Sequence, residues 1–532
     1  MRILSWLVVL LTTPALLGAP GPTTPTPVKD RKALREEARR FAQQFGHLVE
    51  QVSTQYVRPV PREDLLEAAA NGLYQAARRT PPRDLRAQVR QAVSLASMLR
   101  AQAVSPEAMN NLDKPQLDPI EKYLVRLREE LGDALADGPP ATLVAARSLT
   151  RLLDPHSGVV SAEEQRRNVG MDHEHMGTGL SFREAITPGP LEVEGVHPGS
   201  PAQRAGLRPG DVIVKIDDQP IARASQARLM ALRNSRPLDE GFQNLAAPVA
   251  STPQPVDLPR LVRVTFQRAG SADQTVTLLR ERYRAETVQG VRRRDDNTWE
   301  WMADEKTGLA HIRLTSLGRG TADELRGVLT SLTDRGARGL VLDLRWCPGG
   351  YLNEAVEVAD LFLGNGTIAT IKNRGREDTV YRGSDENQFR KLELIVLVNG
   401  ETSGGAELIA AALQDHARGK VVGQRTLGKA SVQTPLAVGI EGFGFKLTSG
   451  TFVRPSGKNL HRFPDSAGDA DWGVLPDEDA RLSPDLGKRL KQWWVLQGLR
   501  PARAADRLPL DDPRADPQQI AALTLLRKQV VR

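Results

Sequence analysis

A serine and a lysine lie in two segments whose small-residue turns are typical of a catalytic site. Ser403 belongs to the turn 402–405, which follows an apolar segment and precedes a helical one. A hydroxyl at a helix N-terminus lies where developing negative charge is favoured. Lys429 follows a glycine turn at the start of another strand. Burial lowers the pKa of a lysine, so the pattern predicts nucleophilic catalysis by Ser403 with Lys429 as its general base.

A second small-residue turn, at Gly349 and Gly350, follows the apolar segment 339–344. A Gly-Gly turn at a strand end leaves backbone N–H groups free, which suits an oxyanion hole. We expect the N–H groups of Gly349, Gly350 and Gly404 to stabilise the oxyanion of an acyl-transfer reaction. The alternative for this turn is a simple connection between a strand and a helix.

The remaining candidate groups do not form a metal site or a histidine triad. His173 and His175 flank one residue and lack an evident third ligand, whereas a catalytic metal usually needs three protein ligands. Four further histidines are isolated or structural, namely His156, His311, His416 and His461. Cys347 lies in the Gly-Gly turn, but no neighbour clearly lowers its pKa. We therefore expect no metal and no cofactor.

Size and composition indicate a soluble multidomain protein. The chain has 532 residues, which corresponds to two to four domains, and a net charge of +7. Its Lys and Arg residues are spread among Asp and Glu, so a nucleic-acid site is not expected. Cys347 is the single cysteine, so the chain cannot form an internal disulfide.

The N-terminus has the pattern of an export signal. Residues 1–19 combine Arg2, a mostly apolar stretch and small residues near a cleavage point, and a Pro/Thr linker follows at 20–29. We expect an exported protein that is periplasmic or extracellular. It would be tethered to the membrane if the signal stays uncleaved.

Hydrophobic periodicity divides the rest of the chain into four regions. These are a helical N-terminal region at 30–165, a β-rich domain at 172–285, an α/β core at 295–482 and a helical C-terminal tail at 483–532. In the core, strands at 309–314, 339–344 and 392–398 alternate with helices at 321–332, 354–362 and 406–414, which predicts a largely parallel sheet. We expect the Pro-rich stretch 237–259 to be a loop insertion.

The β-rich region resembles a PDZ domain. The resemblance rests on the run 176–180 together with the downstream segments 198–207 and 209–213. It implies that Gly177, Thr178, Gly179 and Leu180 form the loop that binds a chain-terminal carboxylate. Such a loop exposes consecutive N–H groups, and the strand after it can add a peptide as an extra strand.

The core resembles the C-terminal processing, or tail-specific, serine peptidases. The motifs are 342–352, 398–415, 422–433, 445–450, 454–457, 473–477 and Leu-Asp-Pro-His-Ser at 153–157. The resemblance implies a multidomain α/β fold with a tail-specific protease core behind a PDZ domain. It also implies a Ser/Lys dyad in which Gln433 orients Lys429. The expected substrates are proteins or peptides bound through their C-termini, and the resemblance also implies a homodimer formed through the N-terminal helices.

The serine departs from the family pattern, and this leaves alternatives open. Counting back from Glu407 places Gly404 where the family has its nucleophile, one residue after Ser403. Either Ser403 is the nucleophile of a serine endopeptidase, or the chain is an inactive PDZ-containing scaffold that binds peptides. Ser431 also lies near Lys429 but should point in another direction. A structural envelope protein is a third class of function.

Overall fold

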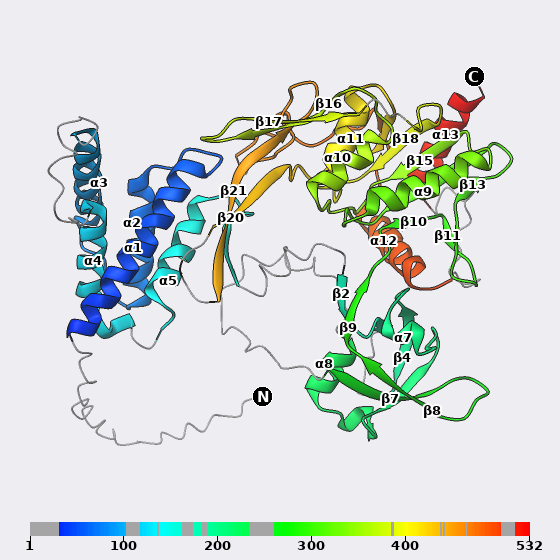
Figure 1. Ribbon diagram of the computed structural model, residues 1–532, viewed down its shortest axis with the longest axis horizontal. Coiled ribbons are helices and arrows are strands. Elements are labelled where there is room, and N and C mark those ends of the chain that lie inside the picture. Colours follow the sequence, from blue (N-terminus) through cyan, green and yellow to red (C-terminus); the bar gives the residue numbers. More distant parts are fainter. Residues whose placement is uncertain are drawn as a thin grey trace, which may run out of the picture.

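The computed structural model describes residues 31–102, 118–135, 138–161, 174–182, 189–233, 260–384, 388–436, 439, 442–463, 465–501 and 516–531. It confirms the predicted multidomain α/β class, with a helical N-terminal region, a β-rich domain and an α/β core (Figure 1). The expected signal at 1–19, the linker at 20–29 and the insertion at 237–259 lie outside the described residues.

The N-terminal region is a bundle of amphipathic helices. On the first helix, Phe41, Phe45, Leu48 and Val52 are buried at helical spacing and form one face of the bundle core. The bundle also includes two short 3-10 turns, η2 (Gly132–Leu135) and η3 (Thr150–Leu152). Its helices are α1 (Arg31–Gln55), α2 (Arg62–Ala76), α3 (Leu85–Gln102), α4 (Pro119–Leu131) and α5 (Ala141–Leu149).

The β-rich domain wraps short strands around its own apolar core. Strands β3, β4, β5, β7 and β8 are hydrogen-bonded in that order, and β2 pairs with β9. The elements are β2 (Glu174–Gly177), β3 (Leu180–Phe182), β4 (Leu191–Val196), α7 (Pro201–Arg204), β5 (Val212–Ile216), β6 (Gln219–Pro220), the 3-10 turn η4 (Ile221–Arg223), α8 (Gln226–Arg233), β7 (Leu261–Gln267), β8 (Gln274–Leu279) and β9 (Glu281–Arg284).

The core is a largely parallel sheet with helices on both faces. Strands β14, β15, β18, β19 and β22 run parallel in that order, and the short strands β10 and β13 pair antiparallel with β14. The elements are β10 (Val288–Gln289), β11 (Arg292–Arg293), β12 (Trp299–Glu300), β13 (Met302–Asp304), β14 (Leu309–Leu314), α9 (Thr321–Asp334), β15 (Gly339–Asp343), α10 (Leu352–Asp360), β18 (Glu393–Val398), α11 (Gly405–Asp415), β19 (Lys420–Gly423) and β22 (Glu478–Asp479). These strands and helices match the predicted ones to within two residues at most ends.

Alternation along each central strand explains the two helical layers. In β15, Leu340 and Leu342 pack with α9, α10 and α11, whereas Val341 packs on the opposite face. That opposite face is covered by the last helix, α13 (Pro517–Val530), through apolar side chains such as Leu526. The parallel arrangement brings the ends of β15 and β18 to one edge of the sheet, where the functional turns lie.

A second, antiparallel sheet connects the core to the helical bundle. Its order is β1-β21-β16-β17, and β20 pairs with β21. Leu436, Phe445 and Leu447 from this sheet are part of the bundle's apolar core. The strands are β1 (Gly158–Ser161), β16 (Gly366–Asn373), β17 (Thr379–Gly383), β20 (Ser431–Leu436) and β21 (Phe443–Val453). The sequence predicted a strand after Lys429 but not this sheet.

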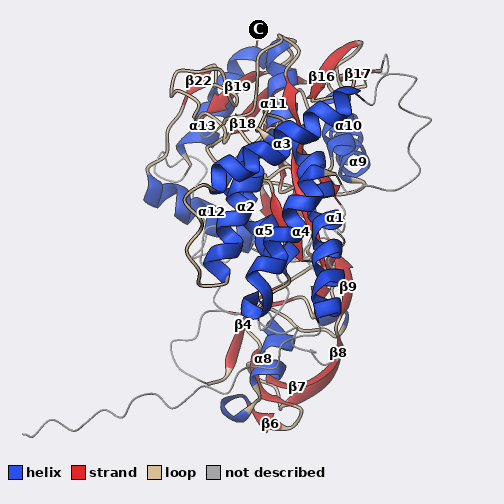
Figure 2. Ribbon diagram, turned by 90° about the vertical axis from the view of Figure 1, so that its left-hand side faces the viewer, coloured by secondary structure: helices blue, strands red, loops and turns tan. Residues whose placement is uncertain are grey.

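Helix α12 (Pro484–Leu499) connects the β-rich domain to the core. At its C-terminal end Leu499 packs so closely on Gly195 of β4 that a Cβ at Gly195 would lie 2.5 Å from the Leu499 Cβ. Figures 1 and 2 agree in placing the β-rich domain at the end of the molecule opposite β16 and β17. Within the described residues, no helix combines the length and hydrophobicity that a membrane crossing requires.

Candidate active site

The turn that carries Ser403 is fixed to the neighbouring strand connection by hydrogen bonds. Thr402 Oγ1 donates to the carbonyl of Leu344 over 2.8 Å, and the Ser403 N–H donates to the carbonyl of Cys347 over 3.0 Å. The Ser403 hydroxyl donates to the carbonyl of Pro348 over 3.1 Å. Ser403 is only 4% exposed. The structure therefore places this hydroxyl at the N-terminus of α11, directly against the Gly-Gly turn.

Gly404 has an unusual backbone conformation at the end of the turn. It is the N-cap of α11 with φ 60° and ψ −125°, a conformation that side-chain-bearing residues rarely adopt. A Cβ at this position would lie 3.2 Å from the Pro348 carbonyl oxygen. The Gly404 N–H donates to Glu407 Oε2 over 3.1 Å, so this predicted oxyanion donor is already engaged. The Gly405 N–H, which sequence reasoning did not select, has no partner among the described residues.

The Gly-Gly turn lies against the Ser403 turn and requires its glycines. A Cβ at Gly349 would lie 2.6 Å from the Gly405 nitrogen and 2.8 Å from the Ser403 carbonyl oxygen. The Gly349 carbonyl accepts from the Leu317 N–H over 2.8 Å. Among the hydrogen bonds of the described residues, none uses the N–H groups of Gly349 or Gly350. The two predicted oxyanion donors are thus adjacent to the serine turn.

A buried ion-pair network anchors the segment that leads into the Gly-Gly turn. Arg345 binds both carboxylate oxygens of Asp343 and reaches Asp516, the N-cap of α13, over 2.9 Å. Burial alone raises the pKa of Asp343, but the Arg345 guanidinium more than offsets this and holds that pKa below its usual range. Asp343 Oδ2 also lies 3.3 Å from His311 Nε2. This network ties the site to the C-terminal helix.

Glu407 joins the serine turn to the lysine segment, a role that sequence reasoning missed. Its Oε2 accepts from the N–H groups of Gly404 and Lys429, at 3.1 and 2.8 Å, and its Oε1 accepts from the Gly428 N–H at 2.7 Å and from Thr426 Oγ1. Burial raises the pKa of Glu407 to about 7, although these hydrogen bonds oppose the rise. The signal was a glutamate three residues after a helix N-cap, the spacing of a capping box.

Lys429 lies two residues before β20, with a partly buried side chain. The next residue, Ala430, accepts through its carbonyl from Phe452 N–H of β21 over 2.9 Å. Backbone bonds on either side of Lys429 therefore fix its position beside α11. The two segments that sequence reasoning selected, around Ser403 and Lys429, come together through Glu407.

Gln433 belongs to a polar network that reaches the Leu-Asp-Pro-His-Ser turn. Its side-chain amide donates to Ser431 Oγ over 2.8 Å and to Thr448 Oγ1 over 3.2 Å. Thr448 Oγ1 in turn donates to Asp154 Oδ1 over 3.1 Å, and the Thr448 N–H donates to Ser157 Oγ over 2.9 Å. The N-terminal motif at 153–157 thus contacts the strand pair that follows Lys429.

The predicted peptide-binding loop begins at the end of β2. Gly179 has φ +84°, and a Cβ there would lie 2.0 Å from the Ser200 Cβ, so only glycine fits. Thr178 is fully buried, and its hydroxyl donates to the Leu232 carbonyl of α8 over 3.0 Å. This side chain therefore fixes the loop to α8 rather than facing a ligand. Leu180 is buried in the domain core.

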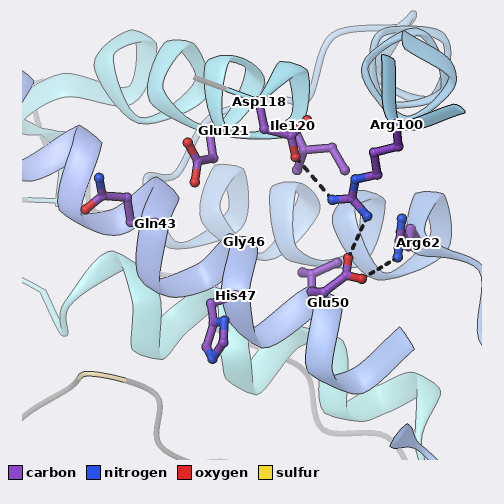
Figure 3. Close-up of a pocket in the computed structure, with 10 residues that line it drawn as sticks. Gln43, Gly46, His47, Glu50, Arg62, Arg100, Asp118, Ile120 and Glu121 are labelled. Carbon is purple, nitrogen blue, oxygen red and sulfur yellow. Dashed lines mark hydrogen bonds and ion pairs between the residues drawn. The ribbon is translucent and has the colours of Figure 1, made fainter. Parts of the chain in front are cut away.

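Two other features lie apart from this site. A cavity of about 310 Å³ in the helical bundle is lined by a charged cluster in which Glu50 binds Arg62 and Arg100 and Arg100 also binds Asp118 (Figure 3). His173 lies outside the described residues. Within the described residues, no three potential metal-ligating side chains gather.

Comparison with known proteins shows what the core and the β-rich domain are similar to. Residues 308–479 match the model of peptidase family S41, and residues 192–237 match that of the PDZ domain. The carboxy-terminal processing protease CtpA of Bacillus subtilis is 26% identical over 360 residues, which cover 67% of this chain and 66% of that protein. The carboxy-terminal-processing protease of Bartonella bacilliformis is 28% identical over 332 residues, covering 61% of this chain and 66% of the relative.

Both alignments therefore span slightly less than two thirds of the relatives' own length. Among solved structures, the photosystem II D1 C-terminal processing protease is similar with a TM-score of 0.40 and 22% identity, over 85% of this chain and 94% of that one. The core of this chain is thus similar to peptidase family S41 and the domain before it is similar to a PDZ domain, and the carboxy-terminal processing proteases are among its relatives.

Proposed function

We propose that this chain is an exported serine endopeptidase that hydrolyses peptide bonds near the C-termini of protein substrates. The observation that carries the proposal is the Glu407 carboxylate. Its Oε2 accepts hydrogen bonds from the N–H groups of both Gly404 and Lys429, so the serine turn and the lysine segment lie side by side. The relatives named as carboxy-terminal processing proteases support the same activity. The signal-like segment 1–19 supports export to the periplasm or the cell exterior, with a membrane tether if it stays uncleaved.

The proposed reaction is acyl transfer through an ester of Ser403. Rotation about the side-chain torsion releases the hydroxyl from the Pro348 carbonyl and turns it toward Lys429. The neutral Lys429 amine takes the hydroxyl proton as the oxygen attacks the peptide carbonyl, and then gives that proton to the leaving amine. Water, deprotonated by the same amine, hydrolyses the ester and regenerates the serine. Gln433 orients the segment that carries Lys429.

The N–H groups of Gly349 and Gly350 are the proposed oxyanion donors. The Gly405 N–H at the first position of α11 is a better third donor than that of Gly404, because Glu407 already accepts the Gly404 N–H. Loss of one such donor typically costs about 10² to 10³ in kcat. The PDZ loop 177–180 would hold the substrate's terminal carboxylate, so cleavage should depend on a free C-terminus.

The test uses an unstructured polypeptide with an apolar C-terminus, offered with either a free or an amidated terminal carboxyl group. We expect the parent protein to cleave the free form faster. Ser403→Ala and Lys429→Ala should each lower the cleavage rate by at least about 10³-fold, because either change removes the acylation step. Cleavage that survives in Ser403→Ala would show that Ser403 is not the nucleophile.

The second candidate function is an inactive peptide-binding scaffold. It is favoured by Gly404, which combines the family's nucleophile position with a backbone geometry that tolerates few side chains. The variant Gly404→Ser separates the two functions. An inert parent that gains cleavage in Gly404→Ser supports the scaffold, whereas an active parent that is unchanged or impaired by this substitution supports Ser403.

The proposed partner besides substrates is a second copy of this chain. On α3, Leu95, Met98 and Leu99 are half or more exposed although they lie in an apolar stripe. A contiguous exposed apolar face of this kind is typical of a protein interface. Sedimentation of the parent and of Met98→Lys should show a dimer that the charged variant weakens, and a monomeric parent would rule the dimer out.

A further inference from the structure

Two histidines that are remote in the sequence meet beside the lysine segment. The rings of His156 and His461 have centroids 6.1 Å apart and lie edge to face, and His461 packs at a right angle on Phe463 at 4.7 Å. His461 is 1% exposed, and neither of its ring nitrogens has a hydrogen-bond partner among the residues that the structure describes. Buried polar atoms without partners are uncommon, and their presence marks a position where another group can bind.

Backbone contacts place the segment that carries His461 next to the segment that carries Lys429. The N–H of Arg462, directly after His461, donates to the carbonyl of Gly428 over 2.8 Å, and Gly428 directly precedes Lys429. A Cβ at Gly428 would lie 2.8 Å from the Arg462 Cβ, so the two segments are in contact.

The His156 side is fixed by the polar network described above. The His156 N–H donates to Asp154 Oδ1 over 2.7 Å, and the same oxygen accepts from Thr448 Oγ1, which accepts from Gln433. One histidine is therefore linked to the residue before Lys429, and the other to the strand that follows it. Lys429 acts electrostatically on His156, and the His461 ring packs against that of His156.

The surroundings of both rings favour their uncharged forms. Burial, followed by the charge of Lys429, lowers the pKa of His156 to about 4, with smaller lowering effects from His461 and from Lys446 of β21. Asp154 acts in the opposite direction but does not offset them. Burial also lowers the pKa of His461. A neutral imidazole nitrogen can accept a hydrogen bond from an amine and shields it from water without adding charge.

We infer that His156 and His461 form a neutral histidine pair that positions the Lys429 amine, with a His156 ring nitrogen accepting one of its N–H groups and His461 closing the apolar side behind it. This role rests on the proposed function, because the lysine acts as its general base. His156 is thus a positioning residue that acts through Lys429, contributed by the Leu-Asp-Pro-His-Ser turn.

The experiment measures the Lys429 amine itself, independently of cleavage. Competitive labelling with acetic anhydride across pH, read for the Lys429 peptide by mass spectrometry, gives the midpoint at which this amine becomes reactive. The variants are His156→Glu, which places an anion beside the lysine, and His156→Leu and His156→Gln, which remove or keep a polar side chain. His416→Gln is the control, because His416 bonds the Thr367 carbonyl on β16.

We expect His156→Glu to raise the labelling midpoint by about one pH unit and to move the acid limb of the kcat/KM profile upward equally. In His156→Leu, kcat should fall about 10- to 100-fold with little change in KM, since a misplaced base affects the transition state. His156→Gln should recover part of this loss, and His416→Gln should match the parent.

The two proposals fail in distinguishable ways. An inert parent whose labelling midpoint still shifts in His156→Glu would contradict the peptidase but support the histidine pair. A cleaving parent whose midpoint and pH profile are the same in all three His156 variants would overturn the histidine pair and leave the peptidase intact. Melting curves identify a misfolded variant, and the remaining His156 substitutions then decide the outcome.

Discussion

At the residue scale, Glu407 is a buried acid whose four hydrogen bonds come from two different chain segments. The hydrogen bonds favour the charged form of this carboxyl group, and burial away from water disfavours it. Burial has the larger effect, since the pKa of Glu407 rises to about 7. The site is therefore assembled around a group that ionises near neutral pH. Sequence reasoning used Glu407 only as a landmark, since a single glutamate gives no indication of which distant N–H groups it will accept.

Glu407 should make stability depend on pH in a defined direction. Its folded pKa, about 7, exceeds the ordinary value of 4.5. Its stabilising contribution is therefore complete below about pH 4.5 and is lost as pH rises through 7, because the unfolded chain ionises first. Over this window we expect the free energy of unfolding of the parent to fall by roughly 3 kcal/mol relative to Glu407→Gln.

The check is urea unfolding of both proteins at intervals from pH 4 to 8. Glu407→Gln cannot titrate at this position, so its own profile supplies the background from all other groups. A difference between the two proteins that stays constant with pH would contradict the raised pKa. If the parent instead gained stability relative to Glu407→Gln as the pH rises, the pKa of Glu407 would be lowered in the folded protein.

At the scale of elements, hydrophobic alternation predicted most of the core but not its lateral contacts. The strands 309–314 and 339–344 and the helices between them were found from local periodicity, because each buries a continuous apolar stripe. The sheet β1-β21-β16-β17 was not predicted, since its pairing joins residues such as Val159 and Phe445 that are far apart in the chain. No local pattern specifies such partners.

We expect the stability of the strand pair β20–β21 to depend on the hydroxyl group of Thr448. Thr448 is fully buried, accepts from Gln433 and donates to Asp154. Thr448→Val keeps the shape and leaves both partners without this bond. We expect the free energy of unfolding to fall by about 1–3 kcal/mol and the cleavage rate to fall with it.

Thr434→Val is the matched control, because its hydroxyl bonds Ser449 in the same strand pair but is only partly buried. Urea denaturation of both variants beside the parent measures the difference. Equal losses in the two variants would show that the Asp154 network contributes nothing beyond an ordinary cross-strand hydrogen bond.

At the scale of the whole molecule, α12 contacts both the PDZ domain and the candidate active site. One end packs on the PDZ strand β4 through Leu499 and Gly195, while Lys491 on the same helix pairs with Glu401, two residues before Ser403. In the middle of the helix, Trp494 packs edge to face on His311, which contacts Asp343. This helix therefore contacts both the PDZ domain and the segment just before the serine turn, and we expect a displacement of the PDZ domain to affect that turn.

We expect a side chain at position 195 to be tolerated only if Leu499 is made smaller at the same time. In Gly195→Ala the new methyl group would lie 2.5 Å from the Leu499 Cβ, so the helix or the strand must move. Overpacking of this kind costs about 1–3 kcal/mol, and we expect the single variant to lose both stability and the preference for a free substrate C-terminus. The exposed Gly199 offers a control, because a Cβ there meets nothing within 4 Å in the described part of the chain, although its φ of +70° adds strain.

Leu499→Gly in the Gly195→Ala background removes the opposing Cβ with the rest of that side chain and should restore the C-terminal preference more than the stability, since the deleted side chain leaves a gap. Cleavage of the free and amidated polypeptides by the single and double variants measures the coupling. A double variant that is no better than the sum of the single changes would mean that α12 supports the two domains separately, and that recognition reaches Ser403 by another route.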